Sequence, residues 1–145
     1  MKPIYAESSF LVSLILQDSN TDQAVQLAAG LKGPLAFNSL LKLEVFNAIQ
    51  LKIAEGKIDA PRAAQCEVKM AELLELGMWR ATEPVWERVI QRSIGLSKAH
   101  TSSKKTRSFD ILHVAAAVEL GATEFWTFDK RQRALAAEAG LRVNP

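Results

Sequence analysis

Four acidic residues that lie far apart in the chain have the types that could do chemistry: Glu7, Glu44, Asp110 and Asp129. Three of them lie at or next to the predicted start of a helix, and Glu44 lies inside one. Clustered carboxylates hold divalent metal ions, and a bound metal ion promotes phosphodiester hydrolysis by activating water. The sequence therefore raises metal-dependent hydrolysis as a hypothesis, provided that the fold brings these side chains together.

Glu44 occupies a helical segment that is apolar on nearly all sides, so we expect this helix to be mostly buried. A buried polar group without partners costs about 2 to 7 kcal/mol. A metal ion would offset that cost, as would an internal salt bridge or a place at the edge of a groove. The apolar residues around and opposite Glu44 are Leu40, Leu41, Ala48, Leu51, Phe46, Ile49 and Ile53.

Each of the other three acids has an ordinary structural explanation when it is taken alone. Glu7 and Asp110 fit the first turn of a helix, where the helix dipole favours a negative charge, and Asp129 fits an N-cap. In a parallel sheet, however, residues that follow strands gather at one edge. Four acids at short range repel one another unless a cation neutralises them, and all-oxygen ligation suits Mg²⁺ or Mn²⁺ better than zinc.

Short apolar runs that alternate with longer helical segments indicate the elements that position these acids. The strand candidates are residues 3–6, 35–37, 78–81, 125–127 and 141–143. Strands separated by helices require crossover connections, which favour a parallel sheet covered on both faces. We predict the order β-α-α-β-α-α-β-α-α-β-α-β and a three-layer α/β/α sandwich with a mostly parallel central sheet, formed by residues 1–145 as one domain.

The predicted helix ends carry residue types that suit them. Thr21, Ser39 and Asp59 are N-cap candidates, and two prolines fit first turns, where a missing N–H costs little. Glycines follow several helical segments, where a residue that tolerates positive φ closes the helix. The residues concerned are Pro61, Pro84, Gly30, Gly56, Gly77, Gly121 and Gly140.

Residues 95–107 are polar and basic with almost no apolar periodicity, so we predict a long loop there. A solvated loop is one interpretation, but this segment precedes Asp110 directly. Together with a basic run after Asp129, it could bind backbone phosphates beside the acids. The predicted RNA-binding residues are Lys98, His100, Lys104, Lys105, Arg107, Lys130, Arg131 and Arg133. His113, among alanines, is assigned to helix packing.

Composition limits the remaining function classes. The chain has 145 residues, 48% of them hydrophobic, and a formal charge of only +2, which excludes a strongly basic protein of the histone kind. The lone Cys66 excludes an intramolecular disulfide, and no Cys/His cluster indicates zinc. The apolar run at residues 10–16 is too short to span a bilayer, and no signal-peptide cleavage site follows it. We therefore expect a cytoplasmic protein without a membrane partner.

Several stretches together resemble the PIN domain, the nuclease domain found in the toxins of VapBC-type toxin–antitoxin pairs. They are YAESS at residues 5–9, SLLKLE at 39–44, RSFDILH at 107–113, and the block from residue 121 through TFD at 127–129 to residue 141. The resemblance covers nearly the whole chain. No single stretch is specific, but their order and spacing are.

The resemblance implies that Glu7, Glu44, Asp110 and Asp129 match the catalytic, metal-binding acids of the family. Two small hydroxyl residues, Ser9 and Thr127, match positions that support those acids or orient water. The implied activity is hydrolysis of RNA with Mg²⁺ or Mn²⁺. The family usually has Asp where this chain has Glu7, and the extra methylene moves the carboxylate, which predicts weak activity or a preference for Mn²⁺.

The resemblance also implies a homodimer and an antitoxin protein whose C-terminal segment covers the acidic groove. The helical segment that ends near Gly77 carries apolar residues that could serve the dimer or the core: Met70, Leu73, Leu74 and Leu76. Two other classes of function are alternatives to the nuclease. A non-catalytic RNA- or protein-binding module of the same fold remains open, whereas a phosphoacceptor receiver would require an acidic neighbour of Glu7 and an Asp after a middle strand.

Overall fold

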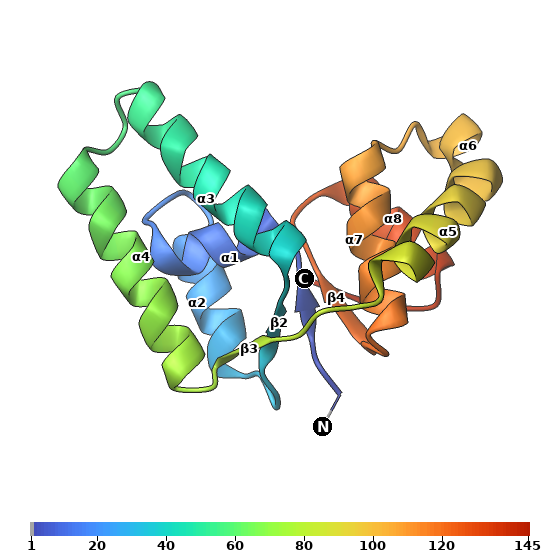
Figure 1. The fold of residues 1–145 in the computed structure, drawn as a ribbon, viewed down its shortest axis with the longest axis horizontal. Coiled ribbons are helices and arrows are strands. Elements are labelled where there is room, and N and C mark those ends of the chain that lie inside the picture. Colours follow the sequence, from blue (N-terminus) through green and yellow to red (C-terminus); the bar gives the residue numbers. More distant parts are fainter. Residues whose placement is uncertain (1) are drawn as a thin grey trace.

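Five short parallel strands form the centre of the computed structural model, which describes residues 2–145 (Figure 1). The strands are β1 (Tyr5–Ala6), β2 (Leu35–Phe37), β3 (Trp79–Ala81), β4 (Glu124–Trp126) and β5 (Arg142–Asn144). Two groups, β1-β4-β5 and β2-β3, are joined by the parallel bridge between Ile4 and Leu35, which gives the order β3-β2-β1-β4-β5. Tyr5 pairs with Phe125, and Phe125 pairs with Val143.

Helices cover both sides of these strands. Figure 1 shows α1 (Ser8–Ile15), α2 (Thr21–Ala29), α3 (Ser39–Ala54) and α4 (Ala60–Glu75) on one side. On the other side lie α5 (Trp86–Leu96), α7 (Ser108–Glu119) and α8 (Lys130–Glu138). The predicted three-layer sandwich is thus confirmed, and the predicted order of elements holds except for the short helical segments between α5 and α7.

Side-chain caps start several of these helices, and the predicted caps need two corrections. Asp59 caps α4 as predicted, with Oδ1 accepting the Arg62 N–H at 2.9 Å. At α3, however, the cap is Asn38 rather than Ser39, and α2 begins at Thr21 itself after Asn20. Asn38 precedes the hydroxyl residue and leads out of β2 in an extended conformation, which is the backbone geometry that an N-cap requires.

Two smaller predictions about helix ends were also wrong. Pro84 lies ahead of Val85, the residue before α5, and not in the first turn. Gly30 has a φ of −91°, whereas Gly56, Gly77, Gly121 and Gly140 all have positive φ, as predicted.

The predicted loop over residues 95–107 is wrong. Beyond α5 the chain continues as a π-helical turn, η1 (Ser97–Thr101), and then as α6 (Ser102–Lys104), and it leaves the helix at Lys105 with a φ of 54°. Only Val89 of α5 is buried, and no residue of η1 or α6 is. A helix that is exposed on nearly every side needs no apolar periodicity, so the pattern could not reveal it.

Aromatic and small residues fill the core between the strands and the helices. Tyr5 stacks on Phe125 with ring centroids 5.5 Å apart, and Phe10 meets Trp126 edge-on. On α7 a run of four residues, Val114 to Ala117, is buried. No helix of residues 2–145 has both the length and the apolar composition that crossing a bilayer requires.

The expectation that α3 is mostly buried is wrong. Leu41, Val45 and Ile49 form its buried stripe, but Leu43 and Leu51 are more than half exposed. The apolar residues therefore extend around the helix without being covered. Glu44 lies between these surfaces and is half-buried.

Candidate active site

The four predicted acids lie on elements that meet at the carboxyl ends of β1 and β4. Glu7 follows β1 directly, and its backbone N–H donates to the Trp126 carbonyl at 3.0 Å, which continues the pairing of β1 with β4. Asp129 follows β4 and caps α8. Asp110 lies in the first turn of α7, and Glu44 lies in the second turn of α3.

Glu7 is the most deeply buried of the four acids, with 8% exposure. Its Oε1 atom accepts the Phe10 N–H at 3.0 Å and the hydroxyl of Ser9, so the side chain caps α1. Burial raises the pKa of the Glu7 carboxyl, and the hydrogen bonds from Ser9 and Phe10 together with nearby His113 oppose that rise. Glu7 is therefore held in place by its own helix.

Glu44 contacts a histidine from another helix. Its Oε1 atom meets Nε2 of His113, a residue of α7 that is 2% exposed. On the opposite side of the imidazole ring, Nδ1 lies 2.8 Å from the hydroxyl of Tyr5 in β1. Within the protein, Glu44 thus has one internal partner, His113, and is partly exposed.

Asp110 and Asp129 line one cavity of about 390 Å³ together with four basic residues, Lys105, Arg107, Lys130 and Arg131. Asp129 Oδ1 accepts two backbone N–H groups at the start of α8, from Arg131 at 2.8 Å and Gln132 at 3.1 Å. Burial raises the pKa of the Asp110 carboxyl, and the charges of Asp129 and Glu44 raise it further, while His113 and Arg107 oppose the rise.

Each of the four carboxylates keeps an oxygen that no protein group occupies. Within the described residues, no hydrogen bond reaches the second oxygen of Glu7, Glu44 or Asp129, or either oxygen of Asp110. Among the described residues that are not themselves exposed, Gln132 Nε2 is the only fully buried side-chain nitrogen or oxygen without a partner. The free oxygens of Glu7, Glu44 and Asp110 are therefore not fully buried, and Asp129 is an exposed residue. Such open, hard oxygen donors fit Mg²⁺ or Mn²⁺. Across residues 2–145, no three His, Cys, Asp or Glu side chains are already drawn together around an ion-sized space.

The predicted basic residues divide into two sets. Four of them line the cavity of Asp110 and Asp129, and all four are exposed. Of the others, Lys104 pairs with Glu138 at 3.7 Å, and Lys98 and His100 lie on η1. Arg133 lies on α8 one turn after Asp129 and does not line that cavity.

The two predicted hydroxyl residues contact the acids differently. Ser9 donates directly to Glu7, whereas buried Thr127 accepts the Asp129 backbone N–H at 3.1 Å and donates to Gln132 Oε1 at 2.9 Å. His113, which was expected to serve helix packing, is buried and also contacts Glu44, and the Tyr5 hydroxyl contacts the other side of its ring. One available signal was spacing, because His113 lies three residues after Asp110 on one helix, and Tyr5 lies in β1 two residues before Glu7.

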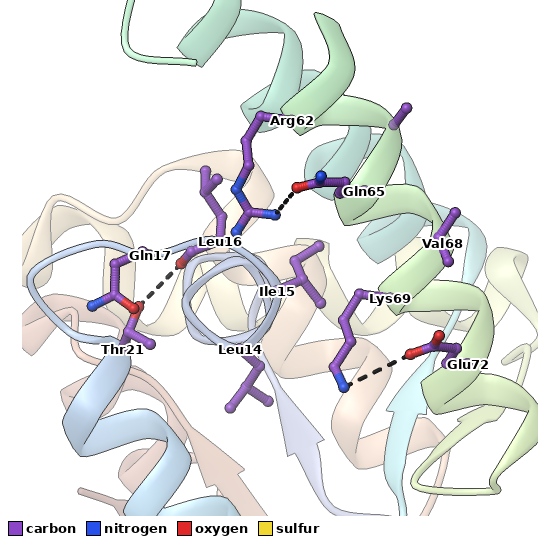
Figure 2. A pocket seen from close by; sticks show the side chains of 11 residues that line it. Leu14, Ile15, Leu16, Gln17, Thr21, Arg62, Gln65, Val68, Lys69 and Glu72 are labelled. Carbon is purple, nitrogen blue, oxygen red and sulfur yellow. Dashed lines mark hydrogen bonds and ion pairs between the residues drawn. The ribbon is translucent and has the colours of Figure 1, made fainter. Parts of the chain in front are cut away.

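Other hollows of the surface lie away from these acids. Figure 2 shows one of about 540 Å³ between α1 and α4, with Arg62 hydrogen-bonded to Gln65 and Lys69 paired with Glu72. None of the four acids lines it. A more apolar groove of about 650 Å³ lies beside α2, β3 and the end of α4. Of the apolar residues predicted for a dimer or the core, Met70 and Leu73 are buried, Leu74 is half-buried and Leu76 is 72% exposed.

Comparison with known proteins places this arrangement in a family. Residues 4–138 match the family model of the PIN domain. The fold is similar to that of VapC20 from Mycobacterium tuberculosis, a sarcin-ricin loop cleaving toxin, with 15% identity, a TM-score of 0.69, and coverage of 98% of this chain and 99% of that one. It is also similar to FitAcB from Neisseria gonorrhoeae, with 15% identity, a TM-score of 0.63, and coverage of 98% and 96%. A search of curated proteins found no match.

Proposed function

Because this chain belongs to the PIN domain family, we propose that it is a metal-dependent endoribonuclease that hydrolyses RNA phosphodiester bonds. The observation that supports this proposal most is the state of the four carboxylates. Glu7, Glu44 and Asp129 are each held by hydrogen bonds to one oxygen and keep the other without a protein partner, and both oxygens of Asp110 are without one. A structural helix cap such as Asp59 also keeps one free oxygen, so the support lies in four such acids on elements that meet at the carboxyl ends of β1 and β4.

The residues that would hold the cation are Glu7, Glu44, Asp110 and Asp129. When bound, Mg²⁺ or Mn²⁺ would lower the pKa of a water molecule and stabilise charge on the leaving oxygen. The protein itself contributes rigidity. Backbone N–H groups fix one oxygen of Glu7 and one of Asp129, so those side chains do not have to be ordered when the substrate arrives.

The exposed basic residues of the Asp110 and Asp129 cavity would bind the RNA backbone. Lys105 and Arg107 precede α7, and Lys130 and Arg131 begin α8, so the two pairs flank the acids from different elements. Contacts of this kind attract phosphates and position the chain without reading bases. Lys98, His100, Lys104 and Arg133 would contribute only at a distance from this cavity.

We further propose that the chain is the toxin of a type II toxin–antitoxin pair and acts in the cytoplasm as a single-domain homodimer. The support is its family and its similarity in fold to a sarcin-ricin loop cleaving toxin. An antitoxin segment that carries an Arg would match the open carboxylates, because a guanidinium binds a carboxylate through two hydrogen bonds.

One observation favours a second candidate, a PIN-fold module that binds RNA or protein but cuts slowly or not at all. Glu7 stands where the family usually has Asp, it is nearly covered, and one of its oxygens is used by Ser9 and Phe10. A misplaced carboxylate weakens a site for Mg²⁺, which demands near-ideal octahedral geometry.

A cleavage assay distinguishes these candidates. The purified protein is incubated with structured and single-stranded RNA in Mn²⁺, Mg²⁺ or EDTA, beside the double variant Glu44→Gln/Asp110→Asn. The control is Glu72→Gln, which removes an exposed acid of α4 away from the site. Cleavage that requires metal and is lost only in the double variant supports the nuclease. Cleavage that survives EDTA contradicts it, and salt-dependent RNA binding without cleavage supports the binding module.

A further inference from the structure

A chain of polar contacts links the start of α3 to Glu44 through β1 and α7. Asn38 Nδ2 lies 3.3 Å from the Tyr5 hydroxyl, which lies 2.8 Å from His113 Nδ1. His113 Nε2 in turn contacts Glu44 Oε1. Asn38, Tyr5 and His113 are at most 2% exposed, so this chain is shielded from water along most of its length. Buried polar groups are expected to be fully hydrogen-bonded, which sets the direction of each bond.

The direction starts at the backbone of α3. The Leu41 N–H donates to Asn38 Oδ1 at 2.9 Å, so the amide group of Asn38 must present its Nδ2 atom to Tyr5. The Tyr5 oxygen therefore accepts, and its proton is directed to His113 Nδ1. A neutral imidazole that accepts at Nδ1 carries its proton on Nε2, from which it donates to Glu44.

A doubly protonated His113 does not fit the same contacts. It would donate from Nδ1 to a Tyr5 oxygen that already accepts from Asn38, and the Tyr5 proton would then lose its acceptor. That proton would be stranded inside the protein, because Tyr5 is fully buried. Burial also raises the pKa of Tyr5, so the hydroxyl remains a donor.

We propose that His113 is a positioning residue for Glu44. In its neutral form with the proton on Nε2, it holds Oε1 of Glu44 and leaves Oε2 to a ligand. The identity of that ligand as a divalent cation rests on the proposed function, whereas the form of His113 does not. A partly exposed glutamate side chain otherwise samples several rotamers, and hydrogen bonds to a ligating carboxylate orient it and reduce that freedom.

Nitrogen-15 NMR of the metal-free protein tests the form of His113 directly. The chain has two histidines, so a His100→Gln variant assigns the signals. We expect His113 to show one protonated and one unprotonated ring nitrogen at neutral pH, with the proton on Nε2. A proton on Nδ1 alone, or on both nitrogens, would overturn the inference. In Tyr5→Phe, whose ring keeps its place against Phe125, the ring-nitrogen shifts of His113 should change, and unchanged shifts would contradict the link.

Binding of Mn²⁺, followed by electron paramagnetic resonance, tests the effect on Glu44. His113→Leu should weaken Mn²⁺ affinity by roughly 10- to 100-fold, the range for groups that orient metal ligands. His113→Gln, whose amide can still donate from a position close to that of Nε2, should recover most of the loss. Tyr5→Phe should weaken binding less than His113→Leu, and it tests the proposal even if the leucine variant does not fold.

The outcomes separate this inference from the proposed function. If His113→Leu and Tyr5→Phe both fold and both bind Mn²⁺ as tightly as the wild type, the positioning role is overturned and the nuclease proposal stays intact. Equal losses in His113→Leu and His113→Gln would show a packing role instead, which also overturns it. Wild-type protein with the expected form of His113 that neither binds Mn²⁺ nor cleaves RNA would contradict the proposed function and, with it, the ligand assigned to Glu44.

Discussion

Asp110 and Asp129 line the same cavity from different helices, and the charge of Asp129 raises the pKa of Asp110 beyond the effect of burial. Two carboxylates that repel each other in the metal-free protein are expected to be stabilised when a cation binds between or beside them. The repulsion therefore lowers the stability of the metal-free protein and favours binding of the cation that the proposed activity requires.

Substitution of Asp110 by Asn should separate these two effects. We expect RNA cleavage to fall at least about 100-fold, because the variant loses a carboxylate that would hold the metal ion. That factor corresponds to roughly 3 kcal/mol of transition-state stabilisation. The melting temperature of the metal-free protein should stay equal or rise, because the repulsion from Asp129 and the cost of burying the charge are both removed. Calorimetry in EDTA beside a cleavage assay measures both. A clear loss of stability in EDTA would contradict the repulsion.

The free energy of unfolding of the metal-free protein should depend on pH through Glu7 and Asp110. Both carboxyl groups have a raised pKa, so the folded state binds their protons more tightly than the unfolded chain does. Their contribution is complete below the ordinary values of 4.5 and 3.8 and is lost as pH rises through each folded pKa. Urea denaturation in EDTA measures it as the difference between wild type and Glu7→Gln at each pH. A difference that is constant from about pH 4 to 7 contradicts the raised pKa of Glu7.

Replacement of Glu7 by Asp should change the choice of metal. Aspartate is as good an N-cap as other short polar residues, so α1 should keep its start, while the carboxylate moves by one methylene toward the usual family geometry. We expect the ratio of cleavage in Mg²⁺ to cleavage in Mn²⁺ to increase. Initial rates across a range of both ions give that ratio. Ser9→Ala serves as a comparison, because it removes a hydrogen bond to Glu7 without changing the acid.

The double variant Arg107→Ala/Arg131→Ala should weaken RNA binding uniformly across sequences. If each arginine neutralises one phosphate, the slope of log affinity against log salt for single-stranded RNA should decrease by about 0.7 per residue. Fluorescence anisotropy in EDTA at several salt concentrations measures the slope without cleavage. Lys69→Ala/Arg62→Ala, which removes the same number of charges beside the hollow of Figure 2, should leave the slope unchanged. Equal decreases of the slope in both double variants would mean that RNA does not bind specifically at the cavity of Asp110 and Asp129.

Much of the fold could be predicted from the sequence because its signals are local. Apolar runs such as residues 35–37 indicate strands wherever they lie, and Asp59 with Pro61 two residues later marks a helix start from nearby residues alone. The segment after α5 could not be predicted in this way. Its helical turns are exposed, so they produce no apolar pattern in the sequence. The hydrogen bond from the Lys105 N–H to the Thr101 carbonyl, at 2.7 Å, depends only on backbone geometry.

The sequence by itself determined which acids the chain has, the order of its strands, and therefore the edge of the sheet at which Glu7 and Asp129 both lie. Parallel topology requires that result, because residues that follow neighbouring parallel strands share an edge. Only the tertiary structure decided what each acid contacts. His113 meets Glu44 and Tyr5 across 69 and 108 residues of sequence, and such contacts depend on how α3, α7 and β1 pack together, which no local pattern encodes.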